Sequence, residues 1–140
     1  MHFLAENPDA YARLQAEVDD FYDTNDLTSP ITYVQAQQLP YLRAIISESL
    51  RLYPSIPYQL PRRSPGFSID NHFVPENYTA SISPMAQNRD LVVYGQDRND
   101  FKPLRWLENS EKTRYLESRD MTFGGNGLRS YTGKKYSIGK

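Results

Sequence analysis

The chain has 140 residues, the length of one ordinary domain, and its formal net charge at pH 7 is only −1. Domains that bind nucleic acid are normally basic, so this charge argues against a nucleic-acid partner. The sequence has no cysteine, which excludes disulfides and thiolate metal ligands, and it has no apolar run of roughly 18 residues that could span a membrane.

The first predicted element is an amphipathic helix over residues 8–23. Asn7 is a candidate helix cap, and Pro8 suits the first helical turn. Apolar side chains recur at helical spacing and share one face, namely Tyr11, Leu14, Val18 and Phe21. We interpret the acidic side chains of this helix as a solvated face and not as a cation site, namely Glu17, Asp19, Asp20 and Asp23.

A second helix start is predicted at Thr32, whose side chain can form a capping box with Gln35. Pro40 then opens a longer helix, which we expect to end at Leu52 because Pro54 follows. The apolar stripe of this helix contains Leu42, Ile45, Ile46 and Leu50.

Beyond this helix, short segments separated by prolines replace the helical pattern. Residues 67–70 and 78–83 alternate in part between apolar and polar side chains, as half-buried strands do, and Asn77 before the second segment tolerates a left-handed turn. We predict that these two segments form a β-hairpin. Residues 84–119 are expected to be mostly irregular, with one short helix at Leu91–Tyr94.

A charged network is predicted between two distant segments. Glu48 and Arg51 are three positions apart on the expected helix and therefore share a face. Arg105 lies among the apolar side chains of residues 101–107, which we expect to draw it into the interior. A buried arginine needs an acidic partner, and Glu48 is the candidate.

Two further features are candidate binding elements. Arg62 lies between Pro61 and Pro65, so its guanidinium is held on a stiff segment and could bind a carboxylate through two parallel hydrogen bonds. Residues 123–133 contain four glycines, which indicates tight turns or a close approach of the backbone to another group. This loop lacks the strand, spacing and helix of a dinucleotide-binding fingerprint, so we reject a Rossmann interpretation.

In their order and spacing, these features resemble the haem-thiolate monooxygenases of the cytochrome P450 family, and most closely its filamentous-fungal members. The resemblance covers nearly the whole chain and rests on the motifs Glu48-x-x-Arg51, Phe101-x-Pro103-x-Arg105-Trp106 and Gly127-x-Arg129-x-Tyr131-x-Gly133. It implies a mainly α fold with a small β-hairpin, as an incomplete C-terminal portion of the cytochrome P450 fold. We expect residues 1–140 to form a single partial domain, with a helical part (1–56), a β-hairpin region (57–83), and the meander and haem-ligand loop (84–140).

The resemblance implies haem as the cofactor and assigns residues to it. Arg62 and Arg129 would contact the haem propionates, and Phe123 would pack near the proximal face. Glu48, Arg51 and Arg105 would form a buried ion network that holds the meander, the segment containing residues 101–107, against the core. The iron-ligand position, which is cysteine in the family, is Tyr131 in this chain.

The ligand loop also departs from the family pattern in length, because it is one residue longer between Phe123 and Tyr131. Counting forward from Phe123 places the ligand at Ser130, whereas counting back from Gly133 places it at Tyr131. We prefer the second count because Gly127 and Arg129 agree with it.

The family reaction is the oxidation of a small organic substrate with O₂, and it needs a reductase. A tyrosine cannot supply the electron density that a thiolate gives to haem iron. We therefore expect a truncated, catalytically inactive monooxygenase-like protein. The alternative is a haem-binding or interaction protein without this activity, which docks on a partner through exposed helix faces.

Two expectations follow from a chain that covers only part of the family fold. The endoplasmic-reticulum anchor usual in the family is expected to be absent, so the compartment stays unassigned. The helix stripe at residues 42–50 is expected to be partly exposed, with the Glu48 network open to solvent.

Overall fold

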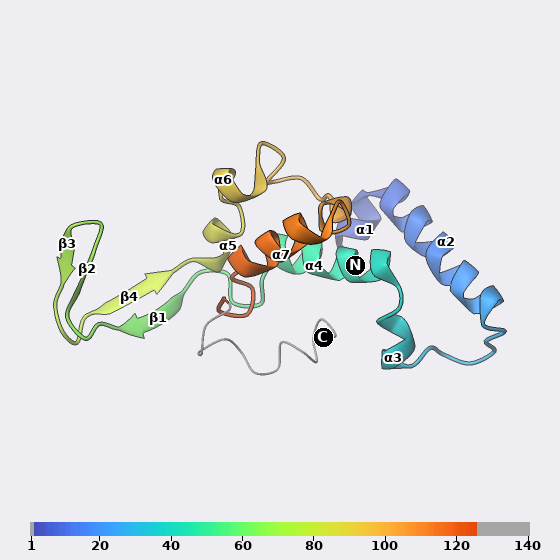
Figure 1. The fold of residues 1–140 in the computed structure, drawn as a ribbon, viewed down its shortest axis with the longest axis horizontal. Coiled ribbons are helices and arrows are strands. Elements are labelled where there is room, and N and C mark those ends of the chain that lie inside the picture. Colours follow the sequence, from blue (N-terminus) through green and yellow to red (C-terminus); the bar gives the residue numbers. More distant parts are fainter. Residues whose placement is uncertain (1, 126–140) are drawn as a thin grey trace.

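The computed structural model describes residues 2–125, which are mainly helical with two small antiparallel sheets (Figure 1). The helical segments are α1 (His2–Glu6), α2 (Pro8–Thr24), α3 (Tyr33–Ala36), α4 (Pro40–Leu52), α5 (Pro84–Gln87), α6 (Leu91–Tyr94), the 3₁₀ helix η1 (Pro103–Trp106) and α7 (Ser110–Arg119). The strands are β1 (Leu60–Arg63), β2 (Phe67–Ile69), β3 (His72–Val74) and β4 (Thr79–Ile82). Within residues 2–125, no helix is both long enough and apolar enough to cross a membrane.

The predicted starts of α2, α3 and α4 are confirmed, but the predicted cap of α2 is wrong. α4 has the predicted bounds, and Pro40 occupies its first turn. Thr32 and Gln35 form the predicted capping box at α3. The prediction that the Asn7 side chain caps α2 is wrong, because its Nδ2 atom instead donates to the carbonyl oxygen of Phe3 at 2.8 Å. That carbonyl belongs to α1, a short helix that the sequence pattern did not indicate.

The interpretation of Glu17 as part of a solvated acidic face is wrong. Its two carboxylate oxygens accept hydrogen bonds from the backbone amides of Tyr41 (2.8 Å) and Leu42 (2.9 Å), in the first turn of α4. The N-cap residue of α4, Leu39, has no side chain that could satisfy these amides. An acidic group on α2 therefore caps α4 and also lies at the positive end of its dipole.

The predicted pairing of residues 67–70 with residues 78–83 is wrong. β2 pairs with β3, and β1 pairs with β4, so one hairpin lies at the end of a longer two-stranded ribbon. The β2–β3 turn consists of Asp70 and Asn71, which both have positive φ, as a two-residue hairpin turn of type I′ requires. Asn77 is left-handed, as predicted, but it lies in the connection that leads into β4.

The short helix α6 is confirmed, but the expectation of irregular structure for the rest of residues 84–119 is wrong. This region also contains α5, η1 and the ten-residue α7. Asn109 caps α7, because its side-chain oxygen accepts a hydrogen bond from the amide of Lys112. α7 carries only one buried side chain, Leu116, which explains why no apolar stripe predicted this helix.

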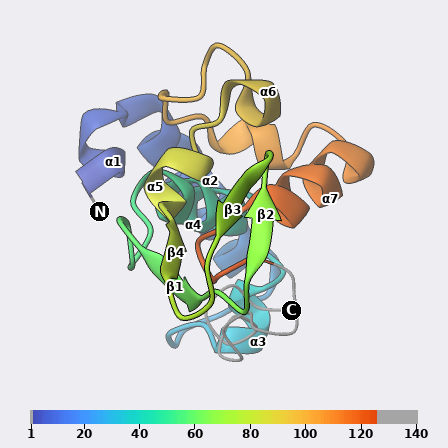
Figure 2. The same cartoon turned by 90° about the vertical axis from the view of Figure 1, so that its left-hand side faces the viewer.

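The core lies where α4, α6, η1 and α7 meet, and the strands extend away from it as an arm (Figure 1). Seen from the end of the arm, the strands lie in front of the helices (Figure 2). The central cluster of the core consists of Ala44, Tyr94, Trp106 and Leu116, with Val93 packed against it. On the arm, by contrast, the side chains of β2 are all exposed. The helices therefore bury α4 from several sides, while the arm has no large core of its own.

Candidate functional site

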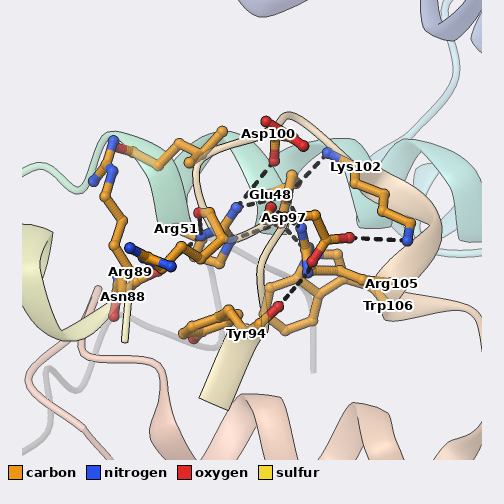
Figure 3. A network of polar contacts seen from close by, with 12 residues as sticks. Glu48, Arg51, Asn88, Arg89, Tyr94, Asp97, Asp100, Lys102, Arg105 and Trp106 are labelled. Atoms are coloured by element: carbon orange, nitrogen blue, oxygen red, sulfur yellow. Dashed lines mark hydrogen bonds and ion pairs between the residues drawn. The ribbon is translucent and has the colours of Figure 1, made fainter. Parts of the chain in front are cut away.

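The carboxylate of Glu48, on α4, is the centre of a buried polar network (Figure 3). It accepts five hydrogen bonds: two from Arg51 (Nε and Nη2, 2.8 Å each), and one each from Arg105 Nε (3.0 Å), Trp106 Nε1 (2.9 Å) and the backbone amide of Lys102 (3.0 Å). Glu48 has 0% of its surface exposed. The carboxylate is thus saturated with donors from α4 and from η1 and its preceding residue.

Arg51 extends the network to three backbone carbonyl oxygens. Its Nη1 atom donates to the carbonyl oxygens of Asn88 and Arg98, both at 2.7 Å, and its Nη2 atom donates to that of Asp100 at 3.3 Å. The guanidinium also lies over the ring of Tyr94, 4.7 Å from the ring centroid, which is a cation–π geometry. One side chain of α4 therefore fixes the loop segments on both sides of α6.

Arg105 links the network to Asp97 near the surface. Its Nη2 atom donates to the carbonyl oxygen of Asp97 at 2.8 Å, and its Nη1 atom lies 3.3 Å from the carboxylate oxygen Oδ1. Lys102 pairs with the other carboxylate oxygen of Asp97 at 2.9 Å. Two guanidinium groups thus face two carboxylates, and the second positive charge of the buried part is balanced by Asp97, which is 33% exposed.

The electrostatics of Glu48 follow from these contacts. Burial alone raises the pKa of a carboxyl group, but the hydrogen bond from Arg51 and the charges of Arg51 and Arg105 outweigh it and lower the pKa of Glu48. Glu48 is therefore held as a carboxylate with no oxygen left to accept a substrate proton. The expectation that this network is open to solvent is wrong, because Arg51 and Arg105 are also only 0% and 3% exposed.

The residues that the resemblance assigns to haem are found as follows. Arg62 lies on β1 with an exposed side chain, and its Nη1 atom donates to the carbonyl oxygen of Pro61 at 2.8 Å. Phe123 is partly buried in the segment that follows α7. Arg129 and Tyr131 lie outside the described residues, as does the alternative ligand position Ser130.

The donor set of the chain does not fit a haem held by a thiolate. None of the 140 residues is a cysteine, so the sequence supplies no thiolate ligand. Residues 2–125 also contain no cluster of three or more histidine, aspartate or glutamate side chains that could hold a metal ion. Arg62, the candidate for a propionate contact among residues 2–125, uses one of its five N–H donors on the carbonyl oxygen of Pro61.

Several members of the network were missed by reasoning from the sequence. Trp106 was expected only as an apolar core residue, yet its indole N–H donates to Glu48. Such a bond could have been anticipated, because a buried indole N–H needs an acceptor. The carbonyl oxygen and the side chain of Asn88 both form hydrogen bonds. The spacing of charged and apolar residues in the sequence does not indicate this role.

The comparisons with known proteins agree with the motifs. The cytochrome P450 family model matches residues 1–135. Similar relatives include "Cytochrome P450 monooxygenase ACRTS1" of Alternaria alternata (35% identical) and "Cytochrome P450 monooxygenase cicH" of Emericella nidulans (37%), each aligned over 97% of this chain, and "Pisatin demethylase" of Fusarium vanettenii (36%), aligned over 99%. The aligned parts are 36%, 28% and 26% of these three proteins, so the chain spans about a third of their length or less. The family match over almost the whole chain, with the Glu48 network at its centre, shows that this chain belongs to the cytochrome P450 family.

Proposed function

We propose that this chain is a cytochrome P450 homologue that does not catalyse monooxygenation, and that residues 1–140 form a single partial domain of that fold. The observation that carries the proposal is the lack of any cysteine among the 140 residues. By the family motif, Tyr131 would stand at the position of the iron ligand. A haem-thiolate enzyme depends on the electron density of the thiolate to favour O–O cleavage. A phenol has an ordinary pKa of about 10 and does not replace this ligand electronically.

The Glu48 network supports the family part of this proposal and has a structural role, not a chemical one. Its groups are saturated with hydrogen bonds and buried, so they can hold segments together but cannot bind a substrate. We infer that Glu48, Arg51 and Arg105 fix the meander against α4. Under this proposal, the family's reductase and small organic substrate are not used by this chain for oxidation.

The test is a turnover assay on the purified chain with added haem, NADPH and a cytochrome P450 reductase. Consumption of NADPH and O₂ can be followed without knowledge of the substrate, because uncoupled turnover also consumes both. We expect no consumption above the level of reductase with haem alone. Haem-dependent consumption by the unaltered chain, together with hydroxylation of a probe substrate, would overturn the proposal.

Two matched variants test which residue occupies the ligand position. Tyr131→Cys and Ser130→Cys each introduce one thiol at the positions given by the two ways of counting the loop. We expect a thiolate-type red shift of the reduced carbon-monoxide spectrum with Tyr131→Cys only. The same shift with Ser130→Cys only would show that the extra residue of the loop lies after the ligand position and would contradict our alignment.

A second candidate function is haem binding or partner binding without oxidation. The observation that favours it is the exposure of large apolar side chains on and next to the arm, including Tyr58 (71%), Phe73 (68%) and Tyr78 (64%). Haem uptake by the unaltered chain that is lost in Tyr131→Phe would support the haem-binding form of this function. Uptake that Tyr131→Phe leaves unchanged would contradict ligation by Tyr131.

A further inference from the structure

Asn88, directly after α5, is completely buried (0% exposed) and connects three parts of the chain. Its backbone carbonyl oxygen accepts the hydrogen bond from Arg51 Nη1 at 2.7 Å. Its side-chain oxygen Oδ1 accepts a hydrogen bond from the amide of Met121 at 2.8 Å, and its Nδ2 atom donates to the hydroxyl of Thr122 at 3.1 Å. One residue therefore joins the Glu48–Arg51 network to the segment that follows α7 (Figure 3 shows Asn88 beside Arg51).

Thr122 fixes the same segment on α4. Its hydroxyl oxygen lies 3.2 Å from the carbonyl oxygen of Leu50 and 2.6 Å from Oδ1 of Asp120. The Thr122 amide also donates to Oδ1 of Asp120 at 3.0 Å, and Thr122 is only 7% exposed. The hydroxyl has one proton and can accept from Asn88 at the same time, so it serves as both donor and acceptor.

The chain turns sharply as soon as it leaves this contact. The amide of Gly124 donates to the carbonyl oxygen of Met121 at 3.0 Å, and Gly124 and Gly125 both have positive φ (81° and 80°). A Cβ atom on Gly125 would lie 3.1 Å from the sulfur of Met121. The direction in which the Gly-rich loop begins therefore depends on where Met121 and Thr122 are held.

We propose that Asn88 is a positioning residue for the Gly-rich loop, and that its hydrogen bonds to Met121 and Thr122, the Asn88 anchor, fix the start of this loop relative to Arg51. The anchor consists of protein groups only and operates in the chain without haem. The inference goes beyond the proposed function, because it concerns how the loop is held and not which ligand it binds. It also predicts that the start of the loop is ordered by the Glu48 network and not by a cofactor.

Local opening of this segment can be measured by native-state hydrogen exchange of the haem-free chain, followed by NMR at the Met121 amide. Asn88→Leu keeps a side chain of similar size but leaves the Met121 amide without its buried acceptor, which favours the open form. We expect exchange at Met121 to become about tenfold to a hundredfold faster, with a much smaller change at the core amides of α4.

The matched control is Asn109→Ala, which also removes an asparagine that accepts a backbone hydrogen bond, but at the exposed start of α7. We expect this variant to leave the Met121 exchange rate within about twofold of the unaltered chain, after correction for global stability. Equal acceleration at Met121 by Asn88→Leu and Asn109→Ala would overturn the proposal, because the effect would then be global.

A second pair of variants keeps the test decisive if Asn88→Leu does not fold. Thr122→Val has nearly the same shape as threonine and removes the hydroxyl, whereas Thr122→Ser keeps it. We expect faster exchange at Met121 with Thr122→Val and recovery of slow exchange with Thr122→Ser. Equal exchange rates in these two variants would contradict the anchor, whatever the activity of the chain.

Discussion

Replacement of Glu48 by glutamine should be among the most damaging single changes in this chain. The variant removes one buried negative charge and leaves Arg51 and Arg105, which are 0% and 3% exposed, without their shared partner. Glutamine also presents an NH₂ group to donors that need an acceptor. Breaking a buried ion pair by removing one partner typically costs about 3–5 kcal/mol. Since domains are stable by only about 5–15 kcal/mol, this loss should be visible as a large shift of the urea midpoint.

Glu108→Gln is the matched control for this experiment. It removes the same charge from a pair with Lys112 whose side chains are 38% and 43% exposed. Such surface pairs contribute at most about 1 kcal/mol. If the two variants lower the free energy of unfolding by similar amounts, the reasoning about the buried network is refuted.

Three further predictions concern the pH dependence of stability, the buried hydroxyl of Tyr94 and the cap of α4. The pKa of folded Glu48 lies below its ordinary value of about 4.3, so the stability that Glu48 contributes should be complete above that pH and should be lost as the pH falls through the folded-state pKa. Urea unfolding at a series of pH values checks this, because the free energy of unfolding should fall less steeply at acid pH in Glu48→Gln than in the unaltered chain. The hydroxyl of Tyr94 is buried with no hydrogen-bond partner in the described part of the chain, so Tyr94→Phe should raise the free energy of unfolding by up to about 2 kcal/mol, and a loss of 1 kcal/mol or more would contradict this account. Glu17→Ala should cost about 1–2 kcal/mol because α4 loses its cap, whereas Asp19→Ala on the exposed side of α2 should stay within about 0.5 kcal/mol in the same denaturation assay.

The sequence predicted those elements whose ends carry strong local signals. α4 begins at Pro40 and is followed by Pro54, and its apolar residues recur at helical spacing, so its bounds could be read directly. The capping box of Thr32 and Gln35 is equally local. The contact of Glu48 with Arg51 could be predicted from their spacing on one helix. The contact of Glu48 with Arg105 could be predicted because Arg105 lies among apolar residues and belongs to a family motif.

The errors arise where local patterns are weak or where the partner is distant in sequence. The short strands alternate too briefly to set their pairing, and two segments, Asp70-Asn71 and Asn77, both offer residues that tolerate a left-handed turn. Glu17 caps a helix that begins more than twenty residues later, which no pattern along α2 can reveal. Asn88 is likewise a polar residue whose partners at Met121 and Thr122 are brought to it only by the tertiary fold.

The expected exposure of the network was wrong for a physical reason. The expected partial exposure of the apolar stripe is confirmed for Leu42, Ile46 and Leu50, although Ile45 is buried. The charged face of α4, which carries Glu48 and Arg51, is instead covered by η1, α6 and α7. As a result, the charged side chains of the network are buried alongside the apolar core residues Ala44 and Trp106. Local burial of charge was therefore achieved by segments within the chain itself.

The most direct test of the central claim is haem-dependent turnover by the unaltered chain, with Tyr131→Cys measured beside it. The account predicts that the unaltered chain consumes no NADPH above the level of reductase with haem alone and gives no thiolate-type carbon-monoxide spectrum, because no cysteine is present. Haem-dependent NADPH consumption with hydroxylation of a probe substrate by the unaltered chain, at or above the level of Tyr131→Cys, would show that Tyr131 is compatible with the chemistry and would contradict the account.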